Sequence, residues 1–517
     1  MKEYDKYLEY KNIISLSKNE LDNSLNAPII LNSDKSKSSE RIDEVKNEKR
    51  RRIKRKLQVW AKSLTAHGFP NIFVTKLVAI KMLWCFSLLI SVTYCIYNIS
   101  REIKNYFNFE YATHLETINQ VPILFPVITL CNINPLITKN GEILVKQIFK
   151  SEYGIHLSNH SLSPLELIKK LDQINLKARL NAFLPEYGDK NRKLLGHNLE
   201  DMLIECFYNH HACTHHDFSW YYSLDYGNCF QFNTGFNSSG HSVEIAKSYK
   251  PGSQNGLSLM LFLGESGNRF SNKWSTGLKI FVHKQKLKPG IYEGINIKPS
   301  TSTNIGIKRS FEKKLPKPFS SCIDLKKYPG SELFNFIKKQ TRFKYRQKDC
   351  FDLCLQKLII DICKCYDLSY PPLKKVTPCL NDSQLKCAND EYMKYINGDN
   401  LKCANIYCPL ECEEVLYEYT LSSSDYPTEY AYQILKSDHH FSRVNNLTYE
   451  KFKERSIRVN IYYSKLNYLS ITQIQKFQLM DLLASIGGLL SFFLGVSLLS
   501  FVEIVELIVE IFLIINS

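Results

Sequence analysis

The stretch GLLSFFLGVSLLSFVEIVELIVEIF (residues 488–512) lies inside a long apolar run that covers residues 482–515. A helix rises about 1.5 Å per residue, so an unbroken helix of this length would exceed the ~30 Å of hydrocarbon in a bilayer. We therefore expect the helix to tilt, to break, or to project beyond the membrane. Gly487, Gly488 and Gly495 are the expected positions for a break or for a close approach of two helices.

Three glutamates interrupt this apolar run. Glu503, Glu506 and Glu510 recur at steps of three and four residues, which places them on one face of a helix. A charged side chain inside the hydrocarbon is costly unless it faces water or a polar partner. The pattern therefore predicts that Glu503 and Glu506 face water, whereas Glu510 is expected to be a solvated residue at the membrane edge.

A second apolar run covers residues 77–97 and is long enough to cross a bilayer as a helix. Its one charge, Lys81, lies close enough to one end for the side chain to reach the interface. The basic run KNEKRRRIKRK (residues 46–56) precedes it and favours a cytosolic N-terminal side. We prefer this interpretation to the alternative, a buried core helix of a soluble protein.

Composition limits the class of protein. Hydrophobic residues make up 44% of the chain and the mean hydropathy is −0.24, which excludes a polytopic membrane protein but allows one or two spans. The net charge of +16 would suit nucleic-acid binding if the basic residues formed one surface. Apart from residues 46–56 they are scattered, so membrane orientation is the better explanation.

The cysteines divide the chain into two kinds of segment. Of 16 cysteines, Cys85 and Cys95 lie in the first apolar run and all others lie between Cys131 and Cys412. An even number confined to one block indicates disulfides in an oxidising compartment. Zinc binding by the C-x-x-x-C and C-x-C spacings within residues 350–365 is the less favoured alternative. Glycosylation sequons occupy the same block, at Asn159, Asn237, Asn381 and Asn446, with Asn98 judged too close to the membrane for modification.

These observations predict a membrane protein with two transmembrane helices and a large disulfide-rich α+β extracellular domain. β-like stretches (LSLMLFL, LKIFVH, SIRVNIYY) alternate there with helical ones (SPLELIKKLDQI, SELFNFIKKQ). The expected segments are a cytosolic tail (1–76), transmembrane helix 1 (77–97), the extracellular domain (98–478), transmembrane helix 2 (479–515) and a cytosolic end (516–517). The protein is then expected in the plasma membrane, with both termini in the cytosol.

Several motifs occur in an order that resembles the degenerin, epithelial sodium channel and acid-sensing ion channel superfamily. They are TAHGFPNIF (65–73), FPVITLCNINP (125–135), HNLEDMLIECFYNHHAC (197–213), DYGNCFQFN (225–233), LPKPFSSC (315–322), YRQKDCFDLCLQKLIIDICKCYDLSYPP (345–372), CPLECEEVLYEYTLSSSDYP (408–427) and IGGLLSFFLGVS (486–497). The resemblance covers nearly the whole chain beyond residue 60. It implies a trimeric channel, and carried over residue by residue it implies these disulfides: Cys131–Cys229, Cys206–Cys213, Cys322–Cys412, Cys350–Cys408, Cys354–Cys403, Cys363–Cys387 and Cys365–Cys379.

The resemblance also implies a pore. Gly495, Val496 and Ser497 match the G-x-S selectivity filter, which is expected to interrupt the helix in an extended turn. Val496 is bulkier than the small residue usual in the family, which leaves the preference for sodium over calcium open. Ser491 resembles a contact for the blocker amiloride, and Glu503 and Glu506 would form acidic rings in a trimer. Without the resemblance, the G-V-S sequence would equally suit a helix packing patch.

Gating residues are implied in the same way. His67 and Gly68 resemble the cytosolic pair that influences opening, and Phe109 and Phe319 resemble an aromatic pair between the first span and the thumb, although either could be ordinary core. Acid-sensing members carry two histidines where this chain has Glu110 and Tyr111. They also tend to place carboxylates at the positions of Ser258 and Phe262. Because acid sensing needs clustered titratable groups and these four positions lack that pattern, the sequence argues against proton gating.

The sequence as a whole predicts a subunit of an amiloride-sensitive, sodium-permeable channel, most similar to invertebrate peptide-gated members. Alternatives are a proton-gated, mechanically gated or constitutive channel of the same family, an ATP-gated trimeric channel, and a non-conducting two-span receptor. No nucleophile–base motif suggests an enzyme, and no cofactor is expected besides the permeant ion. The expected partners are two further identical or related subunits, membrane lipid and an extracellular peptide, without nucleic acid. A histidine patch (His210, His211, His215, His216) is expected to be an exposed loop rather than a zinc site.

Overall fold

A computed structural model describes residues 34–153, 189–264, 275–290, 293–328, 330–340, 343–398, 402–437 and 447–516. The chain divides into two compact units. The first unit contains Met1–Asn108 and Phe477–Ser517, and the second is Phe109–Lys476. The expected helical stretch SPLELIKKLDQI lies outside the described residues.

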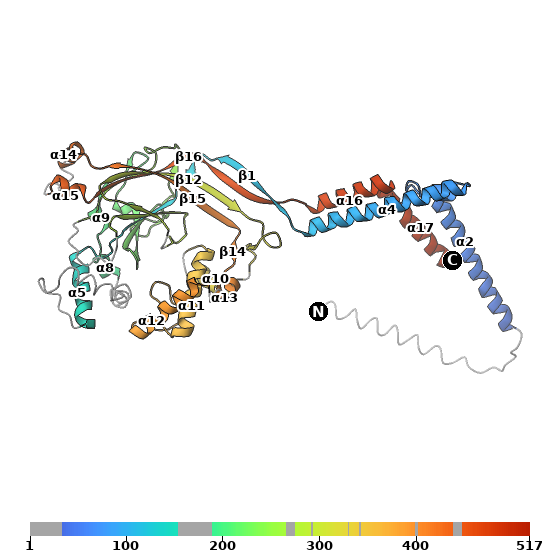
Figure 1. Ribbon diagram of the computed structural model, residues 1–517, viewed down its shortest axis with the longest axis horizontal. Helices are drawn as coiled ribbons and strands as arrows, with labels where there is room; N and C mark the ends of the chain where they lie inside the picture. The colour runs from blue at the N-terminus through green and yellow to red at the C-terminus, as the bar shows by residue number, and fades with distance from the viewer. Residues whose placement is uncertain are drawn as a thin grey trace, which may run out of the picture. The chain divides into compact units, whose positions relative to one another are not determined.

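The first unit is helical. It contains α2 (Asp34–Ser63), α3 (Phe69–Val74), α4 (Val78–Phe107), α16 (Leu479–Leu494) and α17 (Leu498–Asn516). Figure 1 shows α4 and α16 side by side, and the Tyr94 and Phe493 rings meet edge to face with centroids 5.2 Å apart. Their outward faces remain apolar and exposed, as expected for helices that contact lipid.

Helix α4 is longer than the predicted span of residues 77–97, because the helix continues through polar residues to Phe107. Local bonds support this extension, since the Asn98 side chain donates to the Tyr94 carbonyl at 2.8 Å and the Ser100 hydroxyl to the Ile96 carbonyl at 2.7 Å. Among the described helices, α4 alone is long and apolar enough to cross a membrane unaided. The second apolar run does not form one spanning helix, because it is divided between α16 and α17.

The second unit is built on two sheets. The larger has seven strands in the order β15-β12-β16-β9-β4-β5, with β1 also paired to β16. Its strands are β1 (Tyr111–Asn119), β4 (Leu203–Tyr208), β5 (His211–Ala212), β9 (Leu257–Phe262), β12 (Thr301–Lys313), β15 (Glu413–Asp425) and β16 (Ser456–Gln475). All pairs are antiparallel except β12 with β16.

The smaller sheet has five antiparallel strands in the order β11-β10-β3-β7-β6. They are β3 (Val127–Asn132), β6 (Phe218–Ser223), β7 (Gly227–Phe232), β10 (Leu278–His283) and β11 (Ile295–Ile297). One apolar core joins the sheets, with fully buried side chains from both, such as Ile128, Ile280 and Ile461. The three stretches predicted to be β-like are strands β9, β10 and part of β16.

Helices form a separate cluster beside the sheets (Figure 1). It contains α10 (Glu332–Gln340), α11 (Gln347–Cys363), α12 (Asp382–Ile396) and α13 (Lys402–Tyr407), and α10 confirms the predicted helical stretch SELFNFIKKQ. The remaining described elements of this unit are β2 (Ile123–Leu124), β8 (Lys247–Ser248), β13 (Cys322–Ile323), β14 (Leu410–Glu411), α5 (Lys139–Tyr153), α8 (Asp189–Lys193), α9 (Leu199–Met202), η2 (His215–Asp217), α14 (Glu429–Ser437) and α15 (Tyr449–Lys453).

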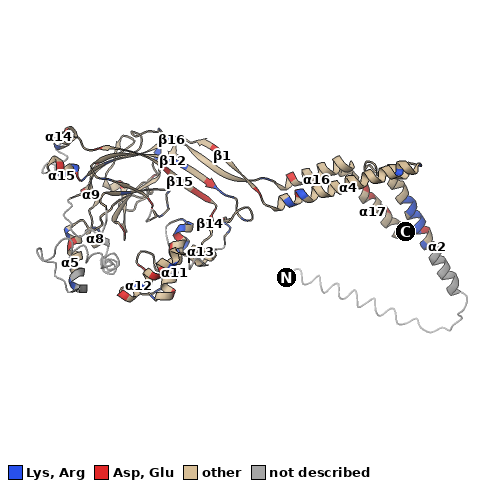
Figure 2. Ribbon diagram, in the orientation of Figure 1, with Lys and Arg blue, Asp and Glu red and all other residues tan. Residues whose placement is uncertain are grey.

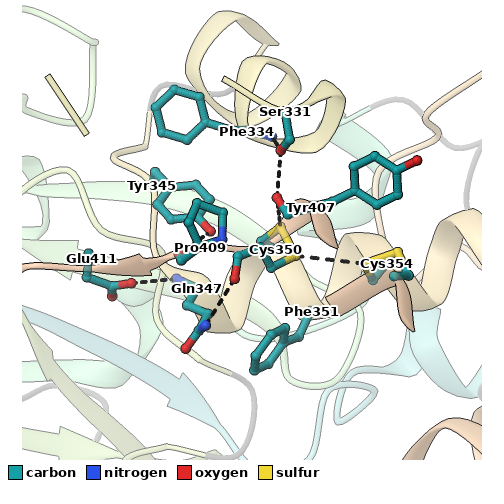
Figure 3. Close-up of a disulfide and its surroundings, with 12 residues drawn as sticks. Ser331, Phe334, Tyr345, Gln347, Cys350, Phe351, Cys354, Tyr407, Pro409 and Glu411 are labelled. Atoms are coloured by element: carbon teal, nitrogen blue, oxygen red, sulfur yellow. Dashed lines mark hydrogen bonds between the residues drawn. A yellow bond between two sulfur atoms is a disulfide. The ribbon is translucent and has the colours of Figure 1, made fainter. Parts of the chain in front are cut away.

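Seven disulfides hold the second unit, and they are the seven pairs that the resemblance implied. Three of them fasten α11 to its neighbours, and Cys365–Cys379 joins the segment just after that helix. The cysteines considered for zinc are therefore all oxidised, and that alternative is wrong. Figure 3 shows the surroundings of Cys350, where the Ser331 hydroxyl donates to the Tyr407 carbonyl at 2.6 Å. Cys85 and Cys95 are free thiols.

The start of α11 is capped by a distant side chain. Arg346, the residue before the helix, provides no side-chain cap. Instead, the Glu411 carboxylate accepts the Gln347 backbone N–H at 2.9 Å (Figure 3), which places negative charge at a helix N-terminus. Because Glu411 precedes Cys412, the Cys322–Cys412 disulfide lies next to this cap.

Candidate functional site

The second apolar run breaks at Gly495, Val496 and Ser497, between α16 and α17. Gly495 has φ of 63°, a left-handed conformation that favours glycine. Its N–H donates to the Ser491 carbonyl at 2.9 Å, and the Val496 N–H donates to the Leu490 carbonyl at 3.3 Å. This is the glycine-terminated helix end expected from local chemistry. Of the three glycines considered for a break, Gly487 and Gly488 instead stay inside α16.

The His-Gly element lies directly against this break. The His67 N–H donates to the Leu494 carbonyl at 2.9 Å. A Cβ atom on Gly495 would overlap His67 Nδ1, so the imidazole occupies the space that a side chain would need. Gly68 precedes α3 with φ of 82° and faces the Trp84 ring on α4. The two predicted elements, far apart in the sequence, thus form one site.

Thr65 extends this contact into α17. Its hydroxyl lies 2.7 Å from the Ser500 hydroxyl and 3.3 Å from Glu503 Oε2, and its N–H donates to the same Glu503 oxygen at 3.1 Å. Ser500 is 2% exposed and also accepts the Ser497 N–H at 3.1 Å. Neither Thr65 nor Ser500 was among the site residues predicted from the sequence. Polar residues flanking the His-Gly and G-x-S motifs were the available signal.

The three glutamates of α17 have different surroundings. Glu503 contacts Thr65, as described, whereas Glu506 is exposed. Glu510 is partly exposed, but its carboxylate pairs with Lys56 of α2 at 2.7 Å rather than being merely solvated at an edge. Lys49 also donates to the Ile515 carbonyl at 3.0 Å, where a cation suits a helix C-terminus. Figure 2 shows the basic residues concentrated on α2, beside α17.

Ser491 and Val496 can also be placed. The Ser491 side chain is exposed on α16, one turn before Gly495. The Val496 side chain is half-buried within the described chain. Its β-branched side chain follows a residue with a left-handed backbone, and the chain re-enters a helix two residues later.

The aromatic pair predicted for gating lies within the second unit. Phe109 and Phe319 meet edge to face with ring centroids 5.5 Å apart. Next to it, Glu110 pairs with Lys476 at 2.6 Å, and the Lys476 N–H donates to the Glu110 carbonyl at 3.1 Å. The first and last residues of the second unit are therefore joined to each other. The role of Lys476 in this contact was not predicted from the sequence.

The positions examined for acid sensing carry other interactions. The Ser258 hydroxyl donates to Asn460 Oδ1 at 2.7 Å, and the Phe262 ring stacks on Phe452 with centroids 6.0 Å apart. A titratable carboxyl occurs elsewhere, on α11. Burial raises the pKa of Asp352 to about 6, while Lys288 opposes the rise.

The remaining predicted residues are surface features. Asn237 is half-buried, and Asn381 is exposed at the start of α12, where its side-chain oxygen accepts the Gln384 N–H at 2.9 Å. Asn159 and Asn446 lie outside the described residues. The histidine patch is a turn between β4 and β5 followed by η2, and no group of three metal-ligand side chains occurs in the described part of the chain.

Comparison with known proteins assigns the family. A profile described as amiloride-sensitive sodium channel matches residues 60–507. The FMRFamide-activated amiloride-sensitive sodium channel of Cornu aspersum is 26% identical, over 86% of this chain and 81% of its own. The acid-sensing ion channel 1C of Danio rerio is 26% identical, over 88% and 83%, and the human acid-sensing ion channel 2 is 25% identical, over 88% and 86%. The chain belongs to the amiloride-sensitive sodium channel family.

Proposed function

We propose that this chain is a subunit of a trimeric, amiloride-sensitive, sodium-permeable channel of the plasma membrane, opened by an extracellular peptide. One observation carries the proposal. The helix formed by the second apolar run is interrupted at residues 495–497, and the His-Gly element packs against this interruption. A packing patch between two ordinary helices would not need this interruption.

The lengths of the helices support a two-span topology. Helix α4 has 30 residues and α16 has 16. At about 1.5 Å per residue, α16 alone covers roughly 24 Å, less than the ~30 Å hydrocarbon core, so the extended segment and α17 complete the crossing. The tail with the His-Gly element and the C-terminal end are then cytosolic, and the disulfide-bonded unit is extracellular, consistent with its oxidised cysteines.

The chemistry of the break suits a cation path. Backbone carbonyls that leave a helix can replace part of the hydration shell of an ion, and small residues allow three chains to approach one axis. Gly495, Val496 and Ser497 would form this ring, with Glu506 below it adding negative charge that attracts cations. Val496 narrows the same ring, and the preference for sodium over calcium is set there.

Two observations support gating by a peptide. The chain is similar to the FMRFamide-activated channel, and it has Glu110, Tyr111, Ser258 and Phe262 where acid-sensing members carry the histidine pair and tend to carry carboxylates. Modulation by acid is the second candidate, because Asp352 titrates near pH 6. His67, Gly68, Phe109 and Phe319 are proposed as gating residues. Conduction through a heterotrimer, mechanical gating, constitutive opening or a non-conducting receptor are the competing outcomes of the test below.

The test is expression of the full chain in oocytes, with surface biotinylation and recording during FMRFamide application and acid steps. The expected result is an inward sodium current that amiloride blocks. Ser497→Phe should abolish the current with surface protein retained, while Ser497→Ala should conduct. Ser491→Ala should raise the amiloride concentration that gives half block. Surface protein without current under any stimulus would contradict a homomeric channel.

A further inference from the structure

The start of α11 meets the smaller sheet through a loop that leaves strand β10. We define the β10 loop as residues 284–290 together with Glu293. The Lys344 N–H donates to the Lys286 carbonyl at 2.7 Å, and the Arg346 guanidinium donates to the Lys288 carbonyl. We propose that Arg346 is a positioning residue for gating, which fastens the β10 loop to α11 so that the smaller sheet and the helical cluster move together when the channel opens. This inference rests on the proposed channel function.

The Arg346 side chain makes contacts in two directions. Toward α11, it holds the Asp349 carboxylate with two bonds, from Nε to Oδ2 and from Nη2 to Oδ1, each 2.9 Å long. Toward the β10 loop, the same guanidinium reaches the Lys288 carbonyl, and its Nη1 lies 3.7 Å from Glu293 Oε2. The planar guanidinium supplies these donors in one fixed geometry, which the single ammonium of a lysine cannot reproduce.

Burial makes these contacts costly to lose. Arg346 is 7% exposed, and the Asp349 side chain is 17% exposed. A charge removed from water needs a partner, so loss of the guanidinium would leave the Asp349 carboxylate uncompensated and the Lys288 carbonyl without this donor. Lys348 also pairs with Glu293, but both of these side chains are exposed and their attraction is screened. Arg346 is therefore the principal side-chain link across this junction.

No covalent link duplicates the contacts of Arg346. The two disulfides that precede residue 230 do not involve α11, and the five at residues 322–412 join only one another. Within the described ranges, no disulfide therefore connects α11 to the β10 loop. Strand β10 itself pairs with β3 along its whole length, from Leu278 to His283, and the loop begins at the next residue. Relative movement of the sheet and the helical cluster is thus concentrated at the junction that Arg346 holds.

The larger sheet reaches the same turn of α11 by a different contact. Glu411 of β14 accepts the Gln347 N–H, as Figure 3 shows, and β15 of the larger sheet begins two residues after Glu411. The start of α11 therefore has one link toward each sheet, Arg346 for the smaller and Glu411 for the larger. A displacement of α11 is passed to both sheets only while both links hold.

The first experiment separates coupling from stability. Oocytes would express full-length variants, with surface biotinylation and dose–response curves for the stimulus that opens the wild type, FMRFamide or protons. Arg346→Met alone leaves the Asp349 charge unpaired and can fail to fold. The double variant Arg346→Met, Asp349→Leu removes both charges, which restores folding but not the link to the β10 loop.

The double variant should reach the surface at wild-type density and need a several-fold higher concentration of the stimulus for half-maximal current. Lys348→Gln is the matched control, because it removes only the exposed pair with Glu293. It should respond like the wild type.

The second experiment replaces the proposed link by a covalent one. The backbone bond between Lys344 and Lys286 places their two Cα atoms about 5–6 Å apart, within disulfide range. Lys286→Cys and Lys344→Cys would be combined with Cys85→Ser and Cys95→Ala and oxidised. After alkylation of free thiols and proteolysis, mass spectrometry should identify a peptide pair joined through positions 286 and 344 that reduction separates. This product demonstrates the internal cross-link directly.

The cross-linked channel then tests the inference. With Arg346 in place, the cross-link should leave the response unchanged, because the joined segments move together. In the double variant of Arg346 and Asp349, it should return the half-maximal concentration toward the wild-type value. Lys286→Cys alone, treated with the same oxidant, should change neither response.

The outcomes separate the two hypotheses. The inference is overturned, and the proposed function stands, if the double variant keeps wild-type sensitivity, if the joined peptides are absent, or if the cross-link silences a channel that retains Arg346. The last result would mean that the sheet and the helical cluster must separate during opening. A surface-expressed wild type that never conducts overturns the proposed function and with it the role in gating, even where the joined peptides establish the contact.

Discussion

The helical cluster around α11 and the break between α16 and α17 are held together in opposite ways. Three disulfides join α11 to neighbouring segments, and Cys350 and Cys354 are fully buried. At the break, the contacts are hydrogen bonds from the His67 and Thr65 segment. Disulfides remain intact when the chain changes conformation, whereas individual hydrogen bonds can break and form again with other partners. We therefore expect the cluster around α11 to keep its shape and the contacts at the break to rearrange more easily.

The largest expected effect comes from Gly495→Ala. The residue has a left-handed backbone, and its Cβ would collide with the His67 ring, so the substitution must displace the His-Gly element. We expect loss of the amiloride-sensitive current with surface protein present. Gly487→Ala is the matched control, because beyond the neighbouring backbone of α16 no atom of the described chain lies within 4 Å of that Cβ, and it should conduct normally. Equal currents from both variants would contradict the assigned contact.

Removing the Cys350–Cys408 disulfide should come next. The bond closes a loop with a sequence separation of 58, and Cys350 is fully buried. The double variant Cys350→Ala, Cys408→Ala should lose about 2–4 kcal/mol of stability and much of its surface expression. Thermal melting of the purified full chain would measure it. The Cys206–Cys213 bond, with a separation of 7, should cost less when removed. A larger loss for this short loop would argue against the loop-entropy explanation.

Asp352→Asn should increase the free energy of unfolding by a smaller, pH-dependent amount. Burial raises the folded-state pKa of Asp352 to about 6, above the ordinary value near 4. The folded state therefore binds more protons than the unfolded state between about pH 4 and pH 6, and stability falls as pH rises through that window. The penalty is absent below the window and complete above it.

The variant should thus melt at a higher temperature at pH 7.4, by the equivalent of about 1–2 kcal/mol, and match the wild type near pH 4. Melting curves across pH would measure the difference. Asp361→Asn is the control, because Asp361 forms an exposed ion pair with Lys374 at 2.9 Å. A pH-independent gain would show that the carboxyl does not titrate in this window.

The smallest effect is expected for the Lys56–Glu510 pair in the first unit. Both side chains are well exposed, at 49% and 36%, so their attraction is screened by water and salt. A double-mutant cycle with Lys56→Gln and Glu510→Gln should give a coupling of about 0–1 kcal/mol in thermal stability. A coupling several times larger would show that this ion pair contributes substantially to the packing of α2 against α17.

Much of the site could be anticipated from sequence, but for different reasons. The disulfide pairs came from the resemblance, since spacing cannot choose among so many connectivities. The break at Gly495 was one of three glycine positions that local chemistry allowed. Its selection depends on the His67 ring, which fills the space beside Gly495 but leaves Gly487 free. Residues adjacent in the chain could not reveal that choice.

Other features were missed because their partners are remote. Thr65, in the loop between α2 and α3, and Ser500, in α17, are 435 positions apart, and neither belongs to a sequence pattern that predicts a partner. The continuation of α4 to Phe107 was missed because hydropathy reports where apolar residues end, not where backbone hydrogen bonding ends. The raised pKa of Asp352 depends on burial that α11 acquires only after packing.

The sequence by itself determined the segments that can enter a membrane, the block that carries cysteines, and the row of glutamates on one helical face, because composition and periodicity are local properties. The tertiary structure alone decided which glycine breaks the helix and which glutamates have partners. Both choices depend on side chains brought together from opposite ends of the chain, where close packing and paired hydrogen bonds select one of several arrangements that local chemistry permits.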